Sequence, residues 1–262
     1  MKILLTNDDG LYSAGLKAAY EALRELGEVF VVAPAVQMSA VGRSLSIMEP
    51  IRVSEVSVNG MHVYAVDGTP TDAVVIGIYE IIGGVPDLTV SGINLGENLS
   101  TEAATTSGTV GAALEAATHG SRAIAISLQM PDLNKFDLSC EHDFGFANKV
   151  LKWISMKAIK EGFPDGVDLL NVNVPMKPNG KVAVTRLARK MYRVFVEKRV
   201  DPRGREYYWI FGNELEDAEE GTDLHALREG YVSVTPLTLD LTAKISMSSV
   251  ERWLGKFGQK EV

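Results

Sequence analysis

Two adjacent carboxylates, Asp8 and Asp9, follow the apolar run Ile3-Leu4-Leu5 near the start of the chain. An apolar run that ends in Asn7-Asp8-Asp9-Gly10 predicts a buried strand that stops in a turn. Because neighbouring anions repel, they are either solvated or neutralised by a cation. Hard cations such as Mg²⁺ take carboxylate oxygens and keep waters whose places a phosphate can share. The segment predicts a metal and phosphate site, with a capped turn whose acids face water as an equally good alternative.

Further oxygen donors follow the second apolar segment, residues 28–34. Ser39 or Ser44 could donate an oxygen ligand, and Arg43 could meet a phosphate. Taken alone, these residues are better explained as an ordinary surface loop. A metal or phosphate role for them therefore depends on whether the loop reaches the turn that carries Asp8.

Two later segments add groups that bind cations or anions. Asn94, flanked by glycines just past an expected strand, could give its amide oxygen to a metal or its NH₂ group to a phosphate. A predicted helix opens with four hydroxyls within five residues, Thr105, Thr106, Ser107 and Thr109. Free N–H groups and the helix dipole attract anions there, and one hydroxyl is enough for a cap. The excess of hydroxyls favours a phosphate.

The surrounding pattern predicts the sheet that positions these groups. Residues 1–34 read as strand, helix and strand, and residues 28–34 are apolar on both faces, as in a buried parallel sheet. Residues 51–58 and 61–66 alternate around Asn59-Gly60, which predicts a hairpin. The turn after the first strand holds acids instead of Gly-x-Gly-x-x-Gly, which argues against a dinucleotide cofactor. We expect a Rossmann-like α/β fold with a mostly parallel sheet flanked by helices. A further strand, 169–175, is expected at or near a sheet margin because it contains Pro175.

The pattern changes beyond residue 180. Residues 192–197 and 207–211 predict a long β-hairpin rich in exposed aromatics, which would serve as an interface arm or as a wall over a binding site. A returning strand at 230–237 and a terminal helix from 246 complete the chain, and the helix could dock on a partner subunit. We expect a catalytic core at 1–180 and an oligomerisation segment at 181–262, integral to one domain.

Bulk composition narrows the classes of function. The net charge of −8 over 262 residues argues against binding to nucleic acid or to membranes, both of which favour a basic surface. The single cysteine, Cys140, excludes an intrachain disulfide and a thiolate zinc site, and it favours a reducing compartment. With no membrane-length apolar run and no signal-like start, we expect a cytoplasmic protein.

Several motifs, in this order along the chain, resemble the survival protein SurE family. They are Thr6-Asn7-Asp8-Asp9-Gly10, Val31-Val32-Ala33-Pro34, Gly68-Thr69-Pro70, Val90-Ser91-Gly92-Ile93-Asn94-x-Gly96-x-Asn98, Ser107-Gly108-Thr109-Val110 and Gly230-Tyr231-Val232-Ser233-Val234-Thr235-Pro236-Leu237. The resemblance implies a divalent-metal-dependent 5′/3′-nucleotidase of broad substrate range that acts on nucleoside monophosphates and forms homodimers or homotetramers.

The resemblance also implies roles for particular residues. One Mg²⁺ or Mn²⁺ ion per subunit would be bound by Asp8, Asp9, Ser39 and Asn94. The phosphate would lie among Asn98, Ser107, Gly108 and Thr109. Beyond what the resemblance implies, our hypothesis of mechanism is that either Asp8 or Asp9 acts as the base toward water.

Two rival functions remain open at the level of the sequence. One is a phosphatase of the haloacid-dehalogenase kind with Asp8 as covalent nucleophile, although that class usually places its second Asp two positions later. The other is a nucleotide-binding protein without turnover. Trapping of a phosphoenzyme tests the first rival, and binding of nucleotide without phosphate release tests the second.

Overall fold

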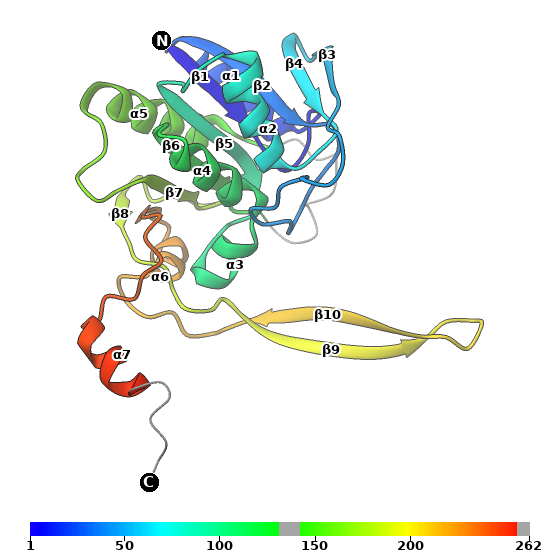
Figure 1. Ribbon diagram of the computed structural model, residues 1–262, viewed down its shortest axis with the longest axis vertical. Coiled ribbons are helices and arrows are strands. Elements are labelled where there is room, and N and C mark those ends of the chain that lie inside the picture. The colour runs from blue at the N-terminus through cyan, green and yellow to red at the C-terminus, as the bar shows by residue number, and fades with distance from the viewer. Residues whose placement is uncertain (131–141, 256–262) are drawn as a thin grey trace.

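The computed structural model describes residues 1–130 and 142–255, and Cys140 therefore lies outside the described residues. A mostly parallel sheet with helices on both faces forms the body of the molecule (Figure 1). The strands are β1 (Lys2–Thr6), β2 (Glu28–Pro34), β3 (Val53–Val58), β4 (Met61–Val66), β5 (Leu88–Leu95), β6 (Ala123–Leu128), β7 (Leu169–Val174), β8 (Val182–Val184), β9 (Tyr192–Val200), β10 (Glu206–Glu214) and β11 (Val232–Leu237).

The helices follow the expected alternation with the strands. They are α1 (Ala14–Leu23), α2 (Pro70–Ile76) with the π-helical turn η1 (Gly77–Ile81), α3 (Ser100–Thr106), α4 (Gly108–Thr118), α5 (Gly145–Glu161), α6 (Asp223–Arg228) and α7 (Met247–Leu254). Local signals explain where several of them begin. Thr69 and Asp72 form a capping box with Pro70 in the first turn of α2, and the Ser13 hydroxyl accepts the N–H of Leu16 at the start of α1.

The order of the nine strands in the main sheet is β3-β4-β2-β1-β5-β6-β7-β11-β8. β1 pairs in parallel with β2 on one side and with β5 on the other. The chain leaving β1 reaches β2, whereas the chain leaving β5 reaches β6 on the opposite side. This reversal places a topological switch point beyond the carboxyl ends of β1 and β5, where open α/β sheets bind ligands.

Side chains of β1 point alternately into two cores. Ile3 and Leu5 join the core beneath α1 and α5, and Leu4 joins the core beneath α2 and α4. The central strands are therefore buried on both faces, as their apolar sequences predict.

The prediction that a strand at 169–175 lies at or near a sheet margin is wrong. β7 lies between β6 and the antiparallel β11. Pro175 comes after the last residue of β7, so its missing N–H interrupts no ladder within the strand.

The hairpin β9–β10 forms a separate two-stranded sheet that reaches away from the body (Figure 1). Both strands are longer than the sequence predicted. The first continues to Val200, and the second begins at Glu206. Tyr208, Trp209 and Ile210 are exposed along it, as are large apolar side chains of α7. Among the described residues, no helix is both long and apolar enough to cross a membrane.

Candidate active site

A cleft of about 290 Å³ opens at the switch point. Its lining comes from the segments after β1 and β2, from the end of β5, and from α3 with the start of α4. The lining residues are Asp8, Asp9, Gln37, Ser39, Ala40, Asn94, Leu95, Gly96, Glu97, Asn98, Ala103, Thr106 and Ser107. The fold thus brings six predicted site residues together, namely Asp8, Asp9, Ser39, Asn94, Asn98 and Ser107.

The Asp8 carboxylate is buried against the N-terminus of α4. Its residue is 5% exposed, and the Thr109 hydroxyl donates to Oδ1 at 2.5 Å. Burial raises the pKa of Asp8, while the Thr109 hydroxyl and the backbone N–H groups of Thr109 and Gly108 oppose that rise. A Cβ at Gly108 would lie 2.7 Å from the Asp8 Cβ, so only glycine permits this close approach. Gly108 and Thr109, predicted to lie around the phosphate, contact Asp8 here.

The Asp9 carboxylate is less buried and lies beside the end of β5. The Leu95 N–H donates to its Oδ2 at 3.2 Å. Burial, together with the charge of Asp8, raises the pKa of Asp9 to about 7. The two neighbouring carboxylates repel each other when both are charged. A bound cation would offset that repulsion and is therefore favoured here.

Asn94 lies inside β5, whereas the sequence predicted that the strand ends before it. β5 continues past a register shift between Ser91 and Asn94. The Asn94 Nδ2 donates to the Gly96 carbonyl at 2.6 Å. That bond uses the nitrogen end of the amide, so the oxygen end is the one able to ligate a cation.

The segment after β2 carries Ser39 to the cleft. The Met38 N–H donates to the Asp8 carbonyl at 2.7 Å, which ties this segment to the turn after β1. The Gln37 Nε2 donates to the Ser39 hydroxyl at 3.0 Å. The loop after β2 therefore reaches the turn that carries Asp8, which is the condition that a role for Ser39 requires.

Arg43 does not line the cleft. Its guanidinium donates to Glu115 and Thr118, near the far end of α4. Two of the hydroxyls predicted to open the helix also have other partners, because Thr105 and Thr106 end α3 and donate to carbonyls within it. Of the four hydroxyls, Ser107 caps α4 by accepting the Val110 N–H, and Thr109 binds Asp8.

Asn98 is held by a buried amide network that sequence reasoning missed. The Asn98 N–H donates to the Asn173 side chain at 2.8 Å, and its Nδ2 donates to the Ser127 hydroxyl at 2.9 Å. The Asn171 Nδ2 donates to the Asn98 carbonyl at 2.8 Å. Two asparagines two residues apart in an otherwise apolar strand are the signal that could have revealed it, since both project from one face of β7.

The donor set of the cleft fits a hard divalent cation. Asp8, Asp9, Ser39 and Asn94 offer two carboxylates and two neutral oxygens, the ligand types that Mg²⁺ and Mn²⁺ accept. Across residues 1–130 and 142–255 there is no group of three or more His, Cys, Asp or Glu side chains placed to share a metal. A cation here would therefore rely on neutral oxygens and water to complete its shell.

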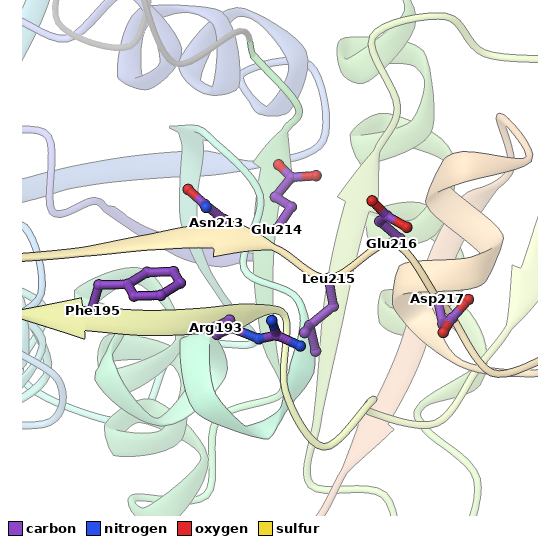
Figure 2. A pocket seen from close by; sticks show the side chains of 7 residues that line it. All are labelled: Arg193, Phe195, Asn213, Glu214, Leu215, Glu216 and Asp217. Carbon is purple, nitrogen blue, oxygen red and sulfur yellow. The ribbon is translucent and has the colours of Figure 1, made fainter.

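A larger cavity, about 480 Å³, lies at the base of the arm (Figure 2). It is lined by Arg193, Phe195, Asn213, Glu214, Leu215, Glu216 and Asp217. None of the predicted site residues lies there. Because the predicted metal ligands converge in the cleft at the switch point, we assign the active site to that cleft and not to the cavity at the base of the arm.

The fold and the cleft define an α/β protein whose switch-point site presents oxygen ligands beside a helix N-terminus. Comparison with known proteins gives the family. The sequence profile of the family described as survival protein SurE matches residues 3–194. The chain belongs to the survival protein SurE family.

Individual relatives resemble the chain over nearly its whole length. A protein of Archaeoglobus fulgidus named 5′-nucleotidase SurE is 78% identical over 253 residues, 97% of each chain. A protein of the same name from Methanococcoides burtonii is 51% identical over 255 residues, 95% of this chain and 98% of its own. The crystal structure of the SurE protein from Aquifex aeolicus superposes with a TM-score of 0.82 at 40% identity, covering 97% of this chain and all of that one.

Proposed function

We propose that the protein is a 5′-nucleotidase that hydrolyses nucleoside monophosphates to nucleoside and phosphate with one Mg²⁺ or Mn²⁺ ion per subunit. The observation that carries the proposal is the convergence of Asp8, Asp9, Ser39 and Asn94 in one cleft at the switch point. The names of the two highly identical relatives support the activity. The resemblance extends the substrates to 3′-nucleotides.

Asp8, Asp9, Ser39 and Asn94 would hold the cation. A cation held there would offset the negative charge of the phosphoryl oxygens and make water more acidic. The protein holds Asp8 in one orientation through Thr109, so little side-chain reorganisation is needed.

Proton transfer and the binding of the phosphate are assigned to further groups in and around the cleft. We assign the proton-accepting role to Asp9, because the Asp8 carboxylate is already engaged by Thr109 and by the start of α4. Asn98 and Ser107 line the cleft and would orient the phosphate. Gly108 and Thr109 would act on the phosphate through their hold on Asp8. Positioning and charge stabilisation of this kind account for most of the catalysis of phosphoryl transfer.

The assembly and the location of the protein belong to the same proposal. Exposed aromatics on the arm and exposed apolar residues on α7 would be covered in a homodimer or homotetramer, with residues 1–180 as the catalytic core. The cytoplasmic location expected from the sequence stays a prediction.

Phosphate release from a panel of nucleoside monophosphates tests the function. With Mg²⁺ or Mn²⁺ the protein should release phosphate, and with chelator it should not. Asp8→Asn should abolish release while circular dichroism shows an unchanged fold. Binding of nucleotide without release under all metals would instead support a binding protein, and a phosphoenzyme trapped at Asp8 would support the haloacid-dehalogenase route.

A further inference from the structure

A cluster of charged and polar side chains from α4, η1 and the segment that follows β2 surrounds a buried carboxylate outside the cleft. At its centre is Glu115, whose side chain is 6% exposed. The Arg43 Nε donates to Glu115 Oε2 at 2.7 Å, and the His119 Nε2 lies 2.9 Å from Oε1. The Tyr79 hydroxyl in turn lies 2.9 Å from His119 Nδ1. Both oxygens of the carboxylate are therefore used.

The cluster fixes Arg43 firmly. A second donor of its guanidinium, Nη2, bonds to the Thr118 hydroxyl at 2.9 Å, so Arg43 contacts the last turns of α4 at two points. A buried carboxylate without a partner is costly, so moving the Arg43 guanidinium away from Glu115 would be strongly unfavourable. The Arg43–Glu115 pair thus resists any movement that would carry Arg43 away from α4.

The segment that carries Ser39 lies between two fixed points. Upstream, the Met38 N–H is bound to the Asp8 carbonyl at 2.7 Å. Downstream, the Gly42 N–H is bound to the Thr106 carbonyl at 2.9 Å, immediately before Arg43. A Cβ at Gly111 would lie 2.5 Å from the Gly42 carbonyl oxygen, which shows how closely the segment rests on α4.

Ser39 itself has little burial to hold it in place. It is exposed, and the following residue, Ala40, has a φ of 58°, a left-handed conformation that non-glycine residues adopt at a cost. A strained and exposed tip keeps its position only if its ends are fixed. The position of the Ser39 hydroxyl therefore depends on the anchors at either end.

We propose that Glu115 and Arg43 are positioning residues that hold Ser39 at the cleft, opposite Asp8 and Asp9. Neither side chain lines the cleft, and each acts through the segment 38–42. The inference rests on the proposed function in one respect, that Ser39 gives an oxygen to the cation. It replaces the sequence-based expectation that Arg43 meets the phosphate.

Two measurements on nucleotide-free protein test this role with Glu115→Gln. Hydrogen exchange of the metal-free chain should show faster exchange at the amides of Met38 and Gly42. Calorimetric titration with Mn²⁺ should show a Kd raised roughly tenfold, the scale found when groups behind metal ligands are removed. Glu161→Gln, the same substitution in the exposed Lys157–Glu161 pair of α5, is the matched control and should change neither.

Combination with Ser39→Ala separates positioning from general destabilisation. If Glu115 acts through Ser39, then Glu115→Gln should add little to the Mn²⁺ Kd of Ser39→Ala. Equal effects of Glu115→Gln in both backgrounds would overturn the proposal, and so would a lowered Tm with unchanged exchange and unchanged Kd. Should Glu115→Gln fail to fold, Arg43→Lys keeps the charge but loses the paired donors, and the same results are expected.

The outcomes also separate this inference from the proposed function. If wild-type protein binds Mn²⁺, Asp8→Asn abolishes binding and Glu115→Gln binds as wild type does, the metal site stands and the positioning role is wrong. If wild-type protein binds no Mn²⁺, both are wrong. If Arg43→Lys raises the inhibition constant of inorganic phosphate while the Mn²⁺ Kd is unchanged, Arg43 is a phosphate ligand and the positioning role is again wrong.

Discussion

Replacing Asp9 by Asn should make the metal-free protein more stable at alkaline pH. In the fold the pKa of Asp9 is raised from 3.8 to about 7 by burial and by the charge of Asp8. The folded chain therefore keeps a proton that the unfolded chain loses between these values. The stability that this proton provides is present below pH 3.8, declines as the pH rises, and is lost above about pH 7.

The size of the effect follows from the shift. A change of about 3 pKa units, at about 1.4 kcal/mol per unit, corresponds to a loss on the order of 4 kcal/mol between acid and alkaline pH. Asn carries no charge at any pH, so Asp9→Asn should flatten the stability profile by a comparable amount. Mn²⁺ should also stabilise the wild type more at pH 8 than at pH 5.5, because cation and proton compete for the same carboxyls.

Urea denaturation with chelator, at fixed protein concentration from pH 4 to pH 8.5, measures the profile. Asp165→Asn, which alters an exposed carboxyl in the connection from α5 to β7, is the control and should leave the profile of the wild type in place. Identical slopes for the wild type and Asp9→Asn would contradict this prediction, since Asp9 would then titrate alike in the folded and the unfolded chain.

Three further predictions concern the hold on Asp8, the packing of α1 against β5, and the arm. Thr109→Val should lower kcat by roughly 10- to 100-fold, because a hydrogen bond to a carboxylate is lost, and steady-state kinetics with an unchanged circular dichroism spectrum would show it. Gly15→Ala should lower the free energy of unfolding by about 1–3 kcal/mol in urea denaturation, because its Cβ would lie 1.8 Å from the Ile93 carbonyl oxygen; an unchanged value would contradict the packing. Trp209→Ser should weaken self-association in sedimentation equilibrium, and an unchanged assembly would exclude the arm from the interface.

Local patterns were sufficient for most of the elements. The alternation around Asn59-Gly60 predicted β3 and β4, and both turn residues have positive φ. The burial of β2 within the sheet was likewise visible in the sequence. These features depend on residues within one turn or one strand of each other, which is the range over which sequence patterns carry information.

Contacts between distant segments were not visible in this way. Arg43 and Glu115 are 72 positions apart, and nothing near Arg43 distinguishes a phosphate ligand from an ion pair. The continuation of β5 to Leu95 depends on pairing with β6 after a register shift. The hydroxyls of Thr105 and Thr106 could not be assigned because α3 ends at Thr106 and α4 begins at Gly108, and the sequence predicted one helix where the structure has two. Tertiary contacts decided the partner of Arg43 and the end of β5.

Anomalous diffraction from crystals grown with Mn²⁺ would test the metal site most directly. We expect one strong anomalous peak per subunit, within coordination distance of oxygens of Asp8, Asp9, Ser39 and Asn94, and no such peak in crystals of Asp8→Asn. A peak at the acidic base of the arm with none in the cleft, or an undiminished cleft peak in Asp8→Asn, would contradict the assignment of the site.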